Sequence, residues 1–307
     1  YVVTMDPDRS VYDGGYVAVD KGKIVGVGPI ESCPDPKGFS EVFDVTGMIV
    51  SPGLVNAHQH HWYTLFKGIS EGKLLEDWLQ DVLVPVSSAL TTEDIKVGSY
   101  LSGLEMLSTG TTSFMNHSVM GLDAEDVEAS IEPFMDLGIR QLFCKELRTS
   151  NERPVNESIG EFMEILNRWD GSGNGMVKIG MVIENAAHWL QMGTTSEELI
   201  VEGWKLAREK RLRISNHITG ATIWRTIKDR IRSEGRNDVE HLMGLGVLGP
   251  EWVLIHCVWM NEREIDYCSR MGANIVVCPA SSAYTAGGTA PIRSSIATRI
   301  KVAIGSD

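Results

Sequence analysis

The stretch PGLVNAHQHHW, residues 52–62, places three histidines within four positions at the end of an apolar run. Side chains two residues apart on a strand point to the same face, so we expect His58 and His60 to point together and His61 to point away. Two imidazoles side by side at a strand end can bind one metal ion, although the same spacing also occurs in solvated loops. The stretch therefore predicts a buried strand that presents a metal-binding pair.

The pattern that begins with this strand repeats along the chain. Short runs rich in apolar and β-branched residues alternate with helix-like segments such as 92–110, several of which begin at Ser, Thr or Asn and end at Gly. Eight such runs joined by helical connections predict an α/β fold, a (β/α)₈ TIM barrel. A doubly wound open sheet is the alternative, but it usually carries a Gly-rich phosphate loop after its first strand. The predicted strands are 48–60, 111–118, 139–146, 177–185, 212–220, 252–259, 273–280 and 301–307.

The first fifty residues show a different pattern of apolar and polar residues from the rest of the chain. YVVTMD (1–6), GGYVAVDKGKIVGVGP (14–29) and SEVFDVTG (40–47) alternate apolar and polar residues, which predicts strands. We interpret residues 1–50 as the N-terminal part of a small flanking β-sandwich and residues 51–307 as the barrel. The chain opens on Tyr1 and stops after AIGSD. We therefore expect a fragment that is truncated after strand eight and lacks the C-terminal part of both domains.

The amino-acid composition argues against some classes of binding partner. With 307 residues, 43% of them hydrophobic and 22% charged, the chain is typical of a globular protein. Its net charge of -13 repels phosphate backbones, so we expect no nucleic acid partner. No apolar run approaches the roughly 20 residues of a membrane span, so we expect no membrane partner. Five cysteines without a CxxC pair predict reduced thiols and a cytoplasmic localisation.

Polar residues also stand at the ends of other predicted strands. His217 lies near the end of the fifth strand, His256 near the end of the sixth and Asp307 at the end of the eighth. Active-site groups of such barrels sit at the carboxyl ends of the strands, so we expect these residues to meet His58 and His60 at one mouth. A single His or Asp there is more often structural. The combination of imidazoles and a carboxylate favours a site for Zn²⁺ or Fe²⁺.

With these residues in place, the chain resembles the amidohydrolase superfamily, in the branch of cytosine, guanine and S-adenosylhomocysteine deaminases and atrazine chlorohydrolase-like triazine hydrolases. VSPGLVNAHQH is similar to the family signature PGLVNxHxH, and LEMLSTGTTSF, GVLGPEWVLIHCVWM and CPASSAYTAGGTAPI are similar to later segments in the same order. The resemblance implies a homo-oligomer for the full-length protein. It implies that one Zn or Fe ion is bound by His58, His60, His217 and Asp307. His256 would polarise the substrate or orient the water, and Asp307 would also act as the base.

The sequence departs from the family at several positions. Gly220 stands where the deaminases usually have a Glu that protonates a ring nitrogen. Glu146 and Glu184, near the ends of the third and fourth strands, are candidate substitutes, although a salt bridge or helix cap is the commoner role for each. His117 and His188 are either substrate residues or solvated loop residues. Val277 and Ser282 replace a usual His and Asn, which leaves the substrate open.

A few further residues have weaker expectations. A binuclear site would need a bridging lysine, but we expect Lys145 to be a pocket or ion-pair residue and Lys178 a surface charge. We expect His241 to be structural. Trp62, Trp78 and Trp189 could wall a flat substrate, although core or rim packing is the default for tryptophan.

These features predict an enzyme, an amidohydrolase acting on carbon–nitrogen bonds other than peptide bonds. A divalent cation lowers the pKa of a bound water from about 16 toward 7, and the resulting hydroxide would attack a small heterocycle and release ammonia or an amine. A hydrolytic dechlorinase or a cyclic-amide hydrolase on the same site is the alternative enzyme. A non-catalytic metal- or ligand-binding barrel is the alternative class, which His256 and Asp307 argue against because binding alone needs neither.

Overall fold

The chain divides into two compact units, Tyr1–Leu54 and Val55–Asp307. This division comes from a computed structural model, which describes residues 1–69, 72–119, 123–148, 154–185, 195–219 and 237–307. The boundary between the units falls shortly after residue 50, close to the point where the pattern of apolar and polar residues in the sequence changes. That the first unit is part of a β-sandwich stays a prediction.

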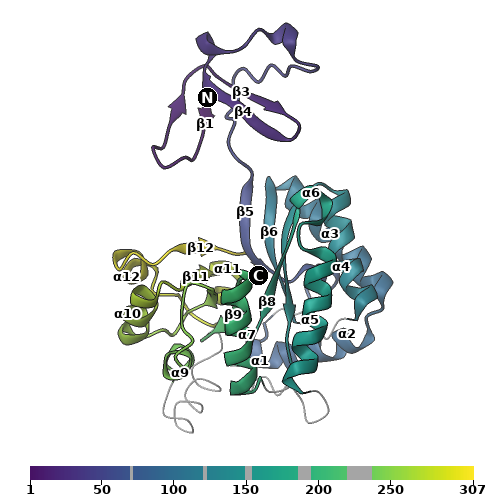
Figure 1. The fold of residues 1–307 in the computed structure, drawn as a ribbon, viewed down its shortest axis with the longest axis vertical. Coiled ribbons are helices and arrows are strands. Elements are labelled where there is room, and N and C mark those ends of the chain that lie inside the picture. Colours follow the sequence, from purple (N-terminus) through teal and green to yellow (C-terminus); the bar gives the residue numbers. More distant parts are fainter. Residues whose placement is uncertain (70–71, 120–122, 149–153, 186–194, 220–236) are drawn as a thin grey trace. The chain divides into compact units, whose positions relative to one another are not determined.

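The first unit contains two antiparallel strand pairs (Figure 1). One strand expected from the sequence is wrong, because residues 41–45 form no regular structure and the Asp44 carboxylate instead accepts hydrogen bonds from the backbone and hydroxyl of Thr46. Val42 and Phe43 are exposed, so the alternating pattern there has no partner strand within the described residues. The strands of this unit are β1 (Val2–Val3), β2 (Val11–Tyr12), β3 (Gly15–Asp20) and β4 (Lys23–Pro29).

The second unit is built on one sheet of eight strands whose spatial order follows the chain from β5 to β12 (Figure 1). The registered neighbours from β6 to β12 pair in parallel. The predicted (β/α)₈ barrel is therefore confirmed, and each predicted strand contains an observed one. The strands are β5 (Leu54–Gln59), β6 (Thr111–Ser118), β7 (Arg140–Glu146), β8 (Val177–Val182), β9 (Ile214–Ile218), β10 (Trp252–His256), β11 (Asn274–Val277) and β12 (Val302–Ile304).

Hydrogen bonds at the end of β12 join the last strand to the first. The backbone N–H groups of Ser306 and Asp307 both donate to the His58 carbonyl, at 3.1 and 3.0 Å. Ser306 N–H also donates to Asn56 Oδ1 at 2.9 Å. The approach is close, because a Cβ at Gly305 would lie 2.7 Å from the His58 Cβ. This contact closes the barrel and places Asp307 beside His58.

Helices cover the outside of the strands (Figure 1). Helix α3 begins with a capping box between Thr91 and Asp94, and α10 begins with one between Asn261 and Glu264. None of the helices in the described ranges has the length and apolarity needed to cross a membrane. The helices are α1 (Leu75–Trp78), α2 (Val84–Ala89), α3 (Thr92–Ser108), α4 (Ala124–Asp136), α5 (Val155–Trp169), α6 (Ser172–Gly175), α7 (Glu197–Lys210), α9 (Asp238–Gly244), α10 (Glu262–Met271), α11 (Pro279–Tyr284) and α12 (Ile292–Ala297).

Apolar clusters hold the barrel unit together, and two of them lie directly against its strands. The larger one joins helix residues such as Ile131, Phe162 and Leu199 to the outer faces of the strands. A smaller one draws on β6, β7, β8, β10 and β11, and we interpret it as the barrel interior beneath the carboxyl ends. All five cysteines are free thiols, and four of them are buried.

Candidate active site

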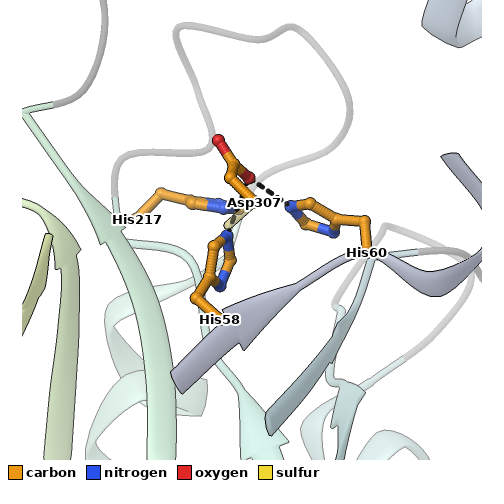
Figure 2. Close-up of side chains that lie close together, drawn as sticks. All are labelled: His58, His60, His217 and Asp307. Atoms are coloured by element: carbon orange, nitrogen blue, oxygen red, sulfur yellow. Dashed lines mark hydrogen bonds and ion pairs between the residues drawn. The ribbon is translucent and has the colours of Figure 1, made fainter. Parts of the chain in front are cut away.

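Four residues predicted from strand ends lie together in the structure (Figure 2). His58 and His60 come from the end of β5, His217 comes from β9, and Asp307 follows β12. One potential ligand atom from each lies within 4.8 Å of all the others. Asp307 Oδ1 lies 2.9 Å from His58 Nε2 and 3.4 Å from His60 Nε2. Ligands of one tetrahedral zinc ion, bound at about 2.0–2.1 Å, lie about 3.3 Å apart, so these separations suit a single divalent cation.

The hydrogen bonds of His60 show why a cation fits this group. His60 Nδ1 lies 2.7 Å from the His117 carbonyl oxygen, which can only accept, so Nδ1 carries the hydrogen. In the neutral imidazole, Nε2 then has a lone pair directed toward the Asp307 carboxylate. This lone pair and the carboxylate are both electron-pair donors, and they repel each other unless a positive charge, such as a metal ion, lies between them. Burial also lowers the pKa of His58 to about 3, which favours the neutral imidazole that binds metals.

Glu184, just after β8, orients His217. Its Oε1 accepts from His217 Nδ1 at 2.6 Å, and its Oε2 accepts from the His217 backbone N–H at 3.0 Å. With Nδ1 donating, Nε2 of His217 is left as the ligand atom, as in carboxylate–histidine–metal arrangements. Burial alone would raise the pKa of Glu184, but His217 and His117 hold it well below its ordinary value. The same carboxylate raises the pKa of His217 against the effect of burial.

His117 belongs to this supporting network. It donates from Nε2 to Glu184 at 2.9 Å, and its Nδ1 lies 2.7 Å from Ser215 Oγ. The side chain is fully buried, and burial holds its pKa well below the ordinary value. The sequence left His117 as either a substrate residue or a solvated loop residue. The structure instead places it behind His60 and His217, and it is not among the residues that line the cavity described below.

The second oxygen of Asp307 faces different partners. Ser281, on α11, donates to Oδ2 at 2.6 Å, and His256 Nε2 lies 3.8 Å from the same atom. Burial lowers the pKa of His256 to about 4 in spite of the nearby carboxylate, so its imidazole is neutral near pH 7. His256, the last residue of β10, also has a positive φ of 69°, which is a strained backbone conformation. Burial opposes ionisation of Asp307, but His256 and His58 hold its pKa well below the ordinary value.

A cavity of about 380 Å³ opens at this cluster. Its polar floor includes His60, His217, His256, Glu184 and Asp307. Its walls are mainly apolar, and Trp78 is among them. This size and composition suit a small, flat organic molecule held by a few polar groups. The other wall residues include Tyr63, Leu75, Leu79, Leu83, Val119 and Tyr284, with Lys73, Glu146 and Arg148 as charged members.

The remaining expectations divide into three groups. His61 bonds Asn116 and Ser130 rather than the cluster, so it points away as expected, although it begins the short helical turn His61–Phe66 instead of continuing the strand. Trp62 is buried in an apolar cluster and is a core residue. His188, Trp189 and Gly220 lie outside the described residues.

The two lysines considered for a bridging role differ in their surroundings. Lys145 is buried on β7, and Lys178 is exposed with Asp170 3.5 Å away, as expected for a surface charge. His241 pairs with Glu197 at 2.9 Å on the outer helices, which agrees with the structural role expected from the sequence.

Sequence reasoning missed Ser281, Tyr63 and Arg148. Ser281 stands in CPASS directly after the seventh strand, so strand-end position could have identified it. Tyr63 stacks on His60 with ring centres 4.4 Å apart, but it lies on the short helical turn His61–Phe66, beyond the end of the predicted strand at residue 60. Arg148 lies two residues beyond β7, and nothing in its local sequence distinguishes it from a surface arginine.

Comparison with known proteins agrees with this geometry. The profile of the amidohydrolase family matches residues 49–307. A 5'-deoxyadenosine deaminase from Methanosarcina mazei is 31% identical over all of this chain and 67% of its own length. A 5-methylthioadenosine/S-adenosylhomocysteine deaminase from Desulforudis audaxviator is 31% identical over 95% of this chain and 65% of its own length. The chain thus spans about two thirds of these relatives.

Solved structures share the fold. A mutant of atrazine chlorohydrolase TrzN from Arthrobacter aurescens, complexed with zinc and atraton, has a TM-score of 0.87 at 22% identity, over 99% of this chain and 70% of that one. Guanine deaminase from C. acetobutylicum, with bound guanine, has a TM-score of 0.78 at 21% identity, over 97% and 70%. These likenesses show the shared fold, and the profile match over residues 49–307 shows that the chain belongs to the amidohydrolase family.

Proposed function

We propose that this chain forms the active site of a metal-dependent aminohydrolase, which removes ammonia or an amine from a small heterocycle. The observation that carries the proposal is the group His58, His60, His217 and Asp307 at the carboxyl ends of β5, β9 and β12, open to a cavity. One divalent cation, Zn²⁺ or Fe²⁺, would be held there, and it would supply a hydroxide nucleophile at neutral pH. The zinc in the TrzN structure and in an adenosine deaminase from Xanthomonas campestris supports this donor set.

The protein groups around the site suit proton transfer. Asp307 Oδ1 faces the histidines, whereas Oδ2, bonded to Ser281, is directed to the same side as His256. We assign to Asp307 the transfer of a proton from the attacking water to the leaving nitrogen. The neutral imidazole of His256 would hydrogen-bond the attacked group or the water and hold it in line.

The substrate class follows from the cavity and from the relatives. Apolar walls that include Trp78 and Leu83 favour a flat ring, and the polar floor favours an amino substituent placed at the cluster. The curated relatives are named as deaminases of adenosine derivatives, and guanine deaminase shares the fold. We therefore propose an amino-substituted purine, pterin, pyrimidine or triazine. We further propose that the protein is a cytoplasmic homo-oligomer that binds no nucleic acid. Residues 1–50 would form part of a β-sandwich.

Metal content and ammonia release test this function together. Purified protein supplied with zinc or iron is expected to contain about one ion per chain by elemental analysis, and to release ammonia from at least one heterocycle. His58→Ala should lose both properties. His241→Asn is the matched control, since it removes a histidine that pairs with Glu197 outside the cluster.

Other outcomes separate the alternatives. Chloride release without ammonia release would indicate the dechlorinase, and ring opening would indicate the cyclic-amide hydrolase. Bound metal and bound heterocycle without any turnover would indicate a binding protein. A folded, metal-supplemented sample without stoichiometric metal would overturn the proposal.

A further inference from the structure

Among the residues that the structure describes, three carboxyl groups line the cavity, and two of them are already engaged. Asp307 directs one oxygen to His58 and His60 and the other to Ser281. The carboxylate of Glu184 accepts one hydrogen bond from His117 and two from His217. These bonds need the ionised form, so Glu184 is a positioning residue rather than a proton donor. The third carboxyl group is that of Glu146.

Glu146 ends β7 and faces the cavity beside Arg148. Its side chain is buried, with 8% exposed, and Arg148 Nη2 lies 2.6 Å from its Oε2. Arg148 is itself anchored, because Nη2 also donates to the Val119 carbonyl at 2.6 Å. This contact of Oε2 with Arg148 can be made whether Glu146 is protonated or ionised, and it holds the side chain in the cavity wall that also includes Glu184.

The surroundings of Glu146 keep its proton available near neutrality. Burial raises the pKa of Glu146 to about 7, although Arg148 and Lys145 act to lower it, and the nearby Glu184 carboxylate adds to the increase. An acid works best when its pKa is close to the working pH, because both of its forms are then populated.

We propose that Glu146 is a further catalytic residue, which donates the proton to the substrate nitrogen adjacent to the attacked carbon. This inference rests on the proposed function. The sequence has Gly220 where the deaminases usually have the glutamate that protonates the ring nitrogen. The inference gives that role to a residue on another strand, β7. It chooses between Glu146 and Glu184, which the sequence alone left equal.

The proton transfers balance over one turnover. Asp307 takes one proton from the attacking water, while Glu146 gives its proton to the ring nitrogen as the oxygen bonds to carbon. Asp307 then passes its proton to the amino group, the carbon–nitrogen bond breaks, and ammonia leaves. The remaining hydroxyl proton returns to Glu146 as the carbonyl forms. Water and the amino compound thus give the lactam and ammonia, and both carboxyl groups recover their starting forms.

The first test is kinetic. Glu146→Gln keeps the size of the side chain but has no proton to give, so kcat should fall by about 10²–10⁴-fold with metal content unchanged. In the wild type, kcat should decline as the pH rises through about 7, because the donor loses its proton, and this limb should be absent in Glu146→Gln. Arg148→Gln should move the limb to higher pH, because Arg148 lowers the pKa of Glu146. Glu128→Gln is the control, since it removes a surface carboxylate paired with Arg168 and should leave the pH profile unchanged.

The second test needs no turnover. Infrared difference spectra of the metal-loaded wild type minus Glu146→Gln should show a protonated carboxyl band at pH 6 that disappears toward pH 8. Full activity with an unchanged pH limb in Glu146→Gln would overturn this inference and leave the proposed function standing. An ionised Glu146 at pH 6 would overturn it even if no substrate is found, whereas absence of ammonia release with the expected band would count against the proposed function alone.

Discussion

At the scale of single residues, the site depends on carboxylates that hold histidines in one orientation. Glu184→Gln removes the negative charge of the carboxylate, which accepts hydrogen bonds from His217 and His117. We expect metal affinity to fall by about 10–100-fold, the usual effect of losing such a partner, while the fold is kept. Titration with a competing chelator measures this affinity. Glu197→Gln is the matched control because it also removes the carboxylate partner of a histidine, His241, away from the site. Equal losses in both variants would refute the orienting role.

Ser281 acts on the other oxygen of Asp307. A hydrogen bond to a charged group contributes about 1.5–3 kcal/mol, and here the hydroxyl lies 2.6 Å from the carboxylate. Ser281→Ala should therefore reduce kcat by about 10–100-fold, since the carboxylate is no longer fixed, with bound metal retained. Parallel measurement of kcat and metal content checks this, and loss of the metal would show that Ser281 supports binding instead. Ser294→Ala, on the outer helix α12, is the control.

At the scale of elements, the junction of β12 with β5 is a close contact that positions the site. A methyl group at Gly305 would lie 2.7–3.0 Å from His58 atoms, including its backbone. We expect Gly305→Ala to lower the free energy of unfolding by about 1–3 kcal/mol, as overpacking does, and to weaken metal binding. Gly160 lies inside α5, and a methyl group added there would meet no atom within 4 Å. Because alanine favours a helix more than glycine does, Gly160→Ala should raise the free energy of unfolding by about 0.5–1 kcal/mol. Urea unfolding of both variants measures the contrast, and equal stability would refute the close junction.

The cap of α10 predicts a pH dependence. Glu264 is fully buried, and burial raises its pKa above the ordinary 4.5 although hydrogen bonds from Asn261 and Val239 lower it. Between 4.5 and the raised value the folded state holds a proton that the unfolded state has lost. Stability from this group is therefore complete below pH 4.5 and lost as the pH rises, by at most about 1.4 kcal/mol per pH unit.

Glu264→Gln isolates this contribution because the amide does not titrate. The unfolding free energy of the wild type minus that of the variant should fall as the pH rises above 4.5. Urea unfolding at several pH values gives this difference. A difference that stays constant with pH would contradict the raised pKa, and a difference that grows with pH would mean that the pKa of Glu264 is lowered in the folded state.

These elements also show how far the sequence could predict the site. The strand ends carrying His58, His217, His256 and Asp307 were predictable, because period-two alternation and the order of strands in a barrel are local properties. The roles of Glu184 and Arg148 depend on which side chain faces which across neighbouring strands, and a single sequence does not reveal register. The same limit explains residues 40–47, where alternation predicted a strand that has no partner in the described part of the chain.

At the scale of the whole molecule, the metal ion connects segments far apart in the chain. His58 and Asp307 are separated by 249 residues, and their contact lies where the barrel closes. A ligand that binds only the folded state stabilises it by about 2.7 kcal/mol at a concentration 100 times its Kd. Without the ion, the link that it makes between His58, His60, His217 and Asp307 at the closure of the barrel is lost. We therefore expect a chelator to lower the unfolding midpoint of the wild type, and added zinc or iron to restore it.

His58→Ala separates this effect from nonspecific metal binding. In this variant the cation loses a ligand, so neither the chelator nor added metal should shift the midpoint, whereas His241→Asn should respond as the wild type does. Scanning calorimetry with and without the chelator provides the measurement. The effect should appear in the transition of the unit Val55–Asp307, because all four residues of the group belong to it. An equal shift in His58→Ala would mean that the ion binds elsewhere and that the cluster closes the barrel without it.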